Sequence, residues 1–92
     1  MKKVLLLKNV MEDMDIGIYS TFDNAKDKLI KIFNKNISNI ETYYNGISEK
    51  EKQAMIKEIK EDIDRVEKSH TIEDFNDKMI DNYDITEWEI DE

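Results

Sequence analysis

Among the side chains that could bind a ligand or take part in catalysis, carboxylates are concentrated in one region of this chain. The last twenty residues hold nine of them, with Lys78 as the only basic side chain. Glu87, Glu89 and Asp91 alternate along the chain, so on a β-strand they would form a row on one face with about 7 Å between neighbours. Every second phosphate along a nucleic-acid strand has a similar spacing, at roughly 3.4 Å per nucleotide. The row is therefore a candidate mimic of a phosphate backbone.

The acidic row belongs to a larger candidate site for a partner protein with a basic surface. The predicted partner-binding residues of this acidic surface are Asp77, Asp81, Asp84, Glu87, Glu89 and Asp91. A simpler interpretation of the same residues is a solvent-facing strand whose charges prevent edge-to-edge aggregation.

Two adjacent tyrosines, Tyr43 and Tyr44, are candidate aromatic anchors for a partner. Neighbouring residues on a helix point about 100° apart, so we expect one ring in the core and the other partly exposed. Tyrosine is favoured among the residues that dominate binding energy at interfaces.

The remaining polar residues do not form a recognisable catalytic set. His70 is the only histidine and falls in a predicted turn between helices, where a solvated or capping role is expected. There is no cysteine to act as a nucleophile or metal ligand. Gly17 and Gly46 are the only glycines, which excludes a glycine-rich phosphate loop. We predict no catalytic residue and expect that the protein is not an enzyme.

The central acids do not resemble a metal site either. On one predicted helix, acids and bases are interleaved: Glu58, Glu61, Asp62 and Asp64 among Lys57, Lys60 and Arg65. That pattern is typical of a solvated helix with ion pairs between successive turns. The run from Asp62 to Asp64 lacks the glycine and the terminal glutamate of a calcium loop. We therefore predict neither a metal nor a cofactor.

The charge is distributed unevenly between the two halves of the 92-residue chain. Residues 1–47 carry seven lysines and six acids, whereas residues 48–92 carry seven bases and sixteen acids. This sign disfavours direct binding to nucleic acid and to anionic membranes. Net charge also keeps proteins soluble without any partner. The apolar run Val4–Leu7 is too short for a signal peptide or a membrane span, so we expect a cytoplasmic protein.

The elements that must position these residues begin with a hairpin. Lys3–Val10 reads as a strand that is apolar on both faces over Val4–Leu7. A polar turn leads to a second strand, Ile16–Tyr19, in which we expect Ile16 and Ile18 on one face and Tyr19 on the other.

Helical spacing of apolar residues dominates the middle of the chain. One helix is predicted over residues 22–44, and a break at Asn34–Asn36 is left open because asparagine is a poor helix former. Ser48 and Glu51 form a capping box that opens a second, antiparallel helix with one apolar stripe: Met55, Ile56, Ile59, Ile63 and Val66. A short third helix follows Thr71.

The closing strand, Tyr83–Ile90, completes the predicted fold. We expect Trp88 and Ile90 to face the helices and Glu87, Glu89 and Asp91 to face solvent; the alternative for Trp88 is a place in an interface. Residues 1–92 then form a single domain of the α+β class in the order β-β-α-α-α-β. Its three-stranded antiparallel sheet would be covered on one face by a helical hairpin and a short third helix.

Two segments resemble a group of small uncharacterised α+β domains from bacteria and phages. One runs from Val4 to Tyr19 into a helix start and includes the Gly17–Ser20 sequence Gly-Ile-Tyr-Ser; the other is the closing strand with Trp88–Asp91, Trp-Glu-Ile-Asp. The resemblance covers about a third of the chain. The long helical middle departs from the shorter members, and no functional residue can be carried over.

These features predict a small acidic protein-interaction module. The first hypothesis is an inhibitor or modulator, of the phage anti-defence type (such as an anti-CRISPR protein) or the nuclease-inhibitor type. It would bind a basic, nucleic-acid-binding surface of a partner protein, in the host cytoplasm if a phage encodes it. The alternative is a homodimeric module that binds or sequesters a small ligand, because helices cannot cover both apolar faces of the first strand.

Overall fold

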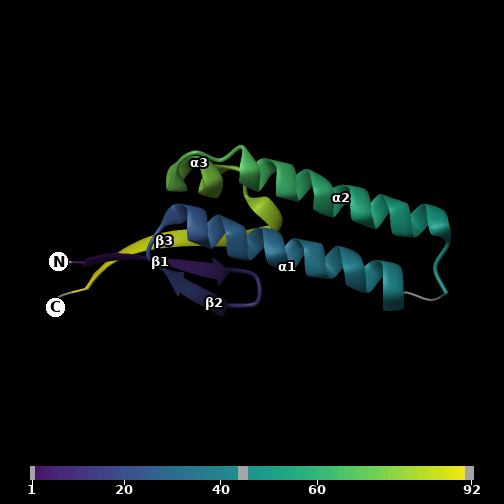
Figure 1. The fold of residues 1–92 in the computed structure, drawn as a ribbon, viewed down its shortest axis with the longest axis horizontal. Helices are drawn as coiled ribbons and strands as arrows, with labels where there is room; N and C mark the ends of the chain where they lie inside the picture. The colour runs from purple at the N-terminus through teal and green to yellow at the C-terminus, as the bar shows by residue number, and fades with distance from the viewer. Residues whose placement is uncertain (1, 44–45, 91–92) are drawn as a thin grey trace.

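The protein has an α+β fold, as the sequence predicts, and the computed structural model describes residues 2–43 and 46–90. Three strands form an antiparallel sheet in the order β2-β1-β3 (Figure 1). Their bounds are Lys2–Asn9 for β1, Met14–Tyr19 for β2 and Tyr83–Ile90 for β3. Strand β1 is therefore central, and β2 and β3 are the two edges.

Helices cover one face of this sheet. Helices α1 (Phe22–Tyr43) and α2 (Glu49–Glu67) form an antiparallel hairpin, and the short α3 (Ile72–Asp77) lies beside β3 (Figure 1). Helix α1 continues through Asn34–Asn36 without a break. The buried stripe of α1 passes on either side of the asparagines, through Phe33 and Ile40, and its packing outweighs their low helix propensity.

Hydroxyl caps fix the starts of all three helices. Thr21 Oγ1 accepts a hydrogen bond from the Asn24 N–H at 3.1 Å, and Ser48 Oγ accepts one from Glu51 at 3.1 Å. Thr71 Oγ1 does the same for Asp74 at 3.0 Å. Each bond satisfies an N–H that the helix itself leaves without an acceptor.

The core lies between the helices and the inner face of the sheet. Its most completely buried side chains come from every layer: Leu7, Leu29, Phe33, Val66, Phe75, Ile80 and Ile85. Edge-to-face aromatic pairs join the layers, with ring centroids 5.8 Å apart for Phe33–Tyr83 and 6.2 Å for Phe22–Phe75.

A β-bulge changes the faces expected for β2. Leu7 pairs with Gly17 but Lys8 pairs with Asp15, so Ile16 is an extra residue. Ile16 and Tyr19 both pack against the core, and Ile18 is 66% exposed. The prediction that Ile16 and Ile18 share a face was wrong, because one inserted residue reverses the alternation.

A left-handed turn without glycine returns the chain from α3 to β3. Met79, Asp81 and Asn82 have φ angles of 50°, 44° and 65°, around the 3₁₀ turn η1 (Ile80–Asn82). Such angles are strained for Met79, whereas aspartate and asparagine adopt them more readily. The fully buried Ile80 and the hydrogen bond from the Val10 N–H to the Asn82 carbonyl (2.9 Å) hold the turn in place.

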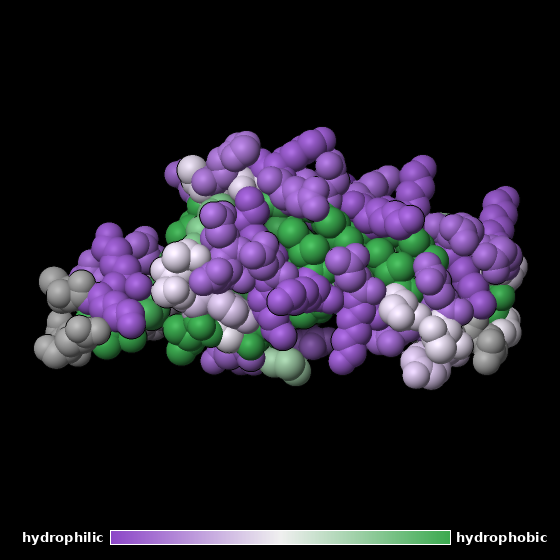
Figure 2. Space-filling view, in the orientation of Figure 1, coloured by the Kyte–Doolittle hydropathy of each residue, from purple (hydrophilic) through white to green (hydrophobic). Residues whose placement is uncertain are grey.

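The molecule is elongated, with extents of 52 × 22 × 20 Å. The α1–α2 hairpin projects beyond the sheet at one end, and β1 and β3 project beyond the helices at the other (Figure 1). Apolar side chains reach the surface along the seam between α1 and α2 and near the projecting strands (Figure 2). A chain this short cannot cover all of its apolar surface.

The Asn76 side chain joins α3 to the outer edge of β3. Its Nδ2 donates to the Ile85 carbonyl, and its Oδ1 accepts from the Ile85 N–H, both at 2.9 Å. The amide group thus takes the place of a neighbouring strand at Ile85, whose side chain is only 1% exposed.

Replacing Asn76→Ala should lower the free energy of unfolding by about 1–3 kcal/mol, because it leaves both polar groups of Ile85 unpaired beside the core. Urea denaturation measures the change. Asp77→Ala, at the neighbouring exposed position, is the matched control and should change stability by less than about 0.5 kcal/mol. Equal stabilities of the two variants would contradict the role given to Asn76.

Candidate functional site

The projecting end of β3 exposes apolar and acidic side chains together. Strand β2 ends at Tyr19, opposite Leu5, so Lys2–Val4 pair only with Trp88–Ile90. These paired segments form a two-stranded ribbon beyond the helices (Figure 1). Ribbon residues Trp88–Ile90 and the preceding Glu87 are all exposed.

Pairing with β1 assigns each of these side chains to a face. Ile85 is opposite Leu7 and Glu87 is opposite Leu5, and the side chains of Leu5, Leu7 and Ile85 are buried under the helices. Glu87 and Glu89 therefore lie on this same face of the sheet. Trp88, opposite Val4, lies on the other face with Ile90.

The prediction that Trp88 and Ile90 face the helices was therefore wrong. Trp88 is 57% exposed and Ile90 is 45% exposed. Burial of Ile85 fixes which face is inward, and Trp88 is an odd number of residues away. Glu87 and Glu89 share the inward face but remain exposed, because the helices do not reach this end of the sheet.

The open face of the sheet is apolar around Trp88. A shallow hollow of about 230 Å³ lies there, lined by Val4, Leu6, Ile18, Trp88, Glu89 and Ile90. The Trp88 indole Nε1 donates to Thr86 Oγ1 at 3.0 Å, which orients the ring along its own strand. We call the face of the sheet that the helices leave uncovered, which carries Val4, Leu6, Ile18, Trp88 and Ile90, the open face.

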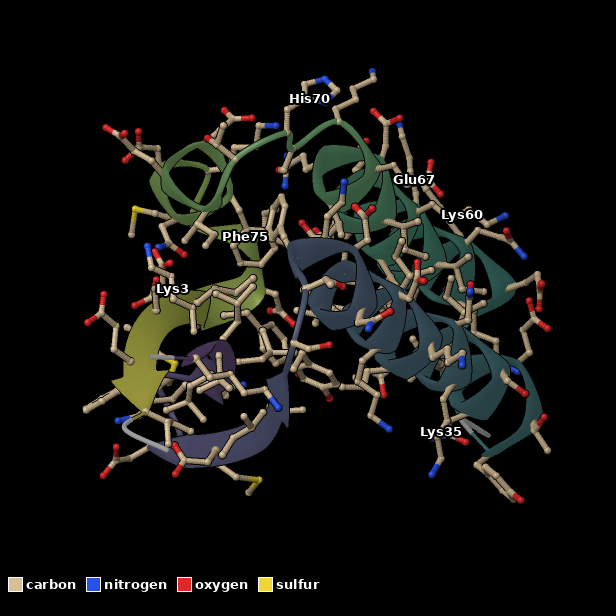
Figure 3. All side chains as sticks on the ribbon, turned by 60° about the vertical axis from the view of Figure 1, so that its left-hand side comes forward. Lys3, Lys35, Lys60, Glu67, His70 and Phe75 are labelled. Carbon is tan, nitrogen blue, oxygen red and sulfur yellow. The ribbon has the colours of Figure 1, made fainter. Side chains whose placement is uncertain are left out.

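Two lysine side chains lie close to acidic residues of β3. Lys3 Nζ is 3.4 Å from Glu87 Oε1, and both side chains are solvated, so the pair stabilises the fold only weakly (Figure 3 labels Lys3). Asp84 is opposite Lys8 on the open face. Lys8 itself forms an ion pair with Asp13 at 2.8 Å.

The predicted acidic residues lie in several places. Glu87 and Glu89 share one face, Asp84 is on the opposite face, Asp77 ends α3, and Asp81 is in η1. Asp91 lies outside the described residues. The structure therefore brings Glu87 and Glu89 together as one short row and separates the others from it.

Asp81 belongs to a second acidic group. Partial burial of its carboxyl, reinforced by the negative charges of Asp62 and Glu12, raises its pKa above the ordinary aspartate value. Burial also raises the pKa of Asp62, although Arg65 Nη1 is only 2.7 Å from its Oδ1. Negative charge is thus mildly unfavourable where α2, η1 and the β1–β2 turn meet.

The tyrosine anchor lies far from this end. Tyr43 is 73% exposed at the last residue of α1, at the opposite end of the molecule from the projecting strands (Figure 1). Tyr44 lies outside the described residues. Tyr43 and the Glu87–Ile90 segment therefore cannot belong to one small contact.

His70 lies on the α2–α3 connection and projects into solvent, whereas Phe75 points into the core (Figure 3). The backbone N–H of His70 donates a hydrogen bond to Asp74 Oδ2 at 3.4 Å. Within residues 2–43 and 46–90, no three acidic, histidine or cysteine side chains converge as metal ligands would. No helix in those ranges combines the length and apolarity needed to cross a membrane.

The sequence held one signal for the open face. The continuous apolar run Val4–Leu7 makes both faces of β1 apolar, and helices cover only one of them. The partner residues on the neighbouring strands, Ile18 and Trp88, follow from pairing registers that periodicity does not specify.

No protein-family model matches this sequence, and no significantly similar curated protein or solved structure was found. We therefore infer function from the residues of the chain itself.

Replacing Asp81→Asn should stabilise the protein at pH 7 by about 0.5 kcal/mol, the scale of one exposed charge interaction. Because folding raises the pKa of Asp81, its ionised form opposes folding, and this penalty disappears as the pH falls below the unfolded value of about 3.9. Thermal unfolding at pH 7 and pH 3 measures the difference. A stabilisation of equal size at both pH values would contradict the electrostatic cause.

Proposed function

We propose that this chain is a small acidic protein-interaction module, an inhibitor or modulator that binds a basic surface of a partner protein. The observation that carries the proposal is the exposed segment Glu87–Ile90. It presents Trp88 and Ile90 on one face and Glu87 and Glu89 on the other.

The tryptophan supplies the main source of affinity in this proposal. Covering the exposed 57% of its surface would contribute on the order of 3 kcal/mol from apolar burial. Tryptophan is enriched among the few residues that dominate interface energetics. Neighbouring apolar residues of the open face, Leu6 and Ile18, extend the contact.

The charge specifies the kind of partner. A net charge of −8 repels nucleic acid and accelerates encounter with a cationic protein surface. Glu87 and Glu89 are about 7 Å apart on one strand face, so they match side chains that normally contact alternate phosphates. A nucleic-acid-binding groove on a nuclease or defence protein has this character, and occupying it would inhibit that protein.

A homodimeric module that binds a small ligand is the second candidate. It is favoured by the apolar hollow of about 230 Å³, which two stacked open faces would enclose. The net charge of −8 opposes this association, so such a dimer would strengthen with salt, whereas binding to a basic partner would weaken. Sedimentation equilibrium at two ionic strengths separates the two candidates.

Variants at the two ends of the molecule test the first candidate. Partner proteins retained from a host lysate at low salt would be identified, and their affinities for the wild type and variants measured by calorimetry. Trp88→Ala should weaken binding by about 2 kcal/mol or more. The double change Glu87→Lys and Glu89→Lys should weaken it further and flatten its salt dependence, because it reverses the charge of the row.

Tyr43→Ala is the matched control, because it removes an exposed aromatic ring from the opposite end of the molecule. Its affinity should equal that of the wild type. Unchanged binding by Trp88→Ala, or an equal loss in Tyr43→Ala, would refute the assignment of the contact to Glu87–Ile90.

A further inference from the structure

Strand β3 is an edge strand whose outer side is only partly occupied. The Ile85 N–H donates to Asn76 Oδ1 and the Ile85 carbonyl accepts from Asn76 Nδ2, so both groups point away from β1. On the same side, the Tyr83 N–H donates to the Ile80 carbonyl. The chain itself therefore satisfies the N–H of Tyr83 and both polar backbone groups of Ile85.

The same side of the strand is open farther along. Successive peptide groups of an antiparallel strand alternate between its two edges, and the β1–β3 register runs without a bulge from Tyr83 to Ile90. Glu87 and Glu89 therefore direct their N–H and C=O groups outward, as Ile85 does. Within the described residues, no other group bonds to these outward atoms.

We propose that the outer edge of β3 at Glu87 and Glu89 is a strand-addition site for an extended segment of the partner protein. The inference rests on the function proposed above and specifies its contact. The added strand pairs its backbone with these two residues and extends the sheet from three strands to four.

The side chains of β3 determine the sequence that this edge accepts. Residues of the added strand that lie beside Glu87 and Glu89 are lysine or arginine, and those beside Trp88 and Ile90 are apolar. Cross-strand neighbours are about 4.5–5.5 Å apart, close enough for both kinds of pairing. The occupant is therefore a strand in which basic and apolar residues alternate.

A second copy of β3 fits this edge poorly. Asn76 already occupies the position at Ile85, so of the described residues of β3 only Glu87 and Glu89 remain for antiparallel pairing. Two copies would then place glutamate opposite glutamate, which is destabilising. Charge complementarity thus favours a basic partner strand over self-association.

The test uses a synthetic peptide of alternating lysine and valine, capped at both ends, and three forms of the protein. Glu89→Gln removes one charge but keeps the outward N–H, whereas Glu89→Pro removes both. Proline is tolerated where the lost N–H faces away from the sheet, so the ladder with β1 is retained. Trp88 fluorescence reports binding.

The wild type should bind the peptide, and Glu89→Gln should bind it about 2- to 5-fold more weakly, as expected for one exposed charge pair. Glu89→Pro should lose at least about a further 5-fold, because a backbone hydrogen bond is also lost. Equal affinities of the two variants would overturn strand addition but leave the acidic contact of the proposed function intact.

Two N-methylated peptides give a second readout that needs no protein variant. The backbone N–H groups of alternate residues in a strand point to the same edge. Methylating the backbone nitrogens of either the lysines or the valines therefore blocks one edge of the peptide strand. One of the two patterns should abolish binding to the wild type, and the other should leave it unchanged. Equal effects of the two patterns, or no binding of the parent peptide at millimolar concentration, would overturn the proposal.

Failure of the proposed function itself would appear elsewhere, as unchanged binding of a captured partner by the Trp88→Ala variant. If the wild type self-associated in sedimentation equilibrium and the Glu89→Pro variant did not, the occupant of the edge would be a second copy of this chain. The partner strand proposed here would then be wrong.

Discussion

The pairing register of β3 with β1 determines which side chains of β3 are buried under the helices and which are exposed. Leu7 and Ile85 are opposite each other and fully buried, so every other side chain of β3 is assigned to a face by its distance from Ile85. A slip of one residue would place Glu87 and Glu89 on the face that now carries Trp88. Burial of Ile85 and its bonds to Asn76 exclude that slip.

The same register explains why an apolar surface remains exposed. The helices cover the inner face where Leu5, Leu7 and Ile85 lie, and beyond the sheet α1 and α2 pack against each other, with Ile40 and Ile56 buried. Within residues 2–43 and 46–90, no element covers the open face or the projecting ends of β1 and β3. Large contiguous exposed apolar surfaces mark interaction sites, and the proposed function assigns this role to the open face.

Much of the fold was predictable from the sequence, because helical spacing, hydroxyl caps and strand alternation are local signals. The start of α2 at Ser48 and the hairpin of β1 and β2 are examples. The orientation of Trp88 was not predictable, because alternation defines two faces without saying which is inward. The bulge at Ile16 and the left-handed Met79 and Asp81 also lack a local signal, since tertiary packing and not glycine stabilises them.

Amide hydrogen exchange in the isolated protein reports which side of β3 each N–H faces, so it tests whether the outer edge of this strand is open at Glu87 and Glu89. We expect slow exchange at Thr86 and Trp88, which bond to β1, and at Ile85, which bonds to Asn76. We expect exchange near the unprotected rate at Glu87 and Glu89. Protection of Glu87 and Glu89 equal to that of Trp88, or the opposite alternation, would contradict the open edge.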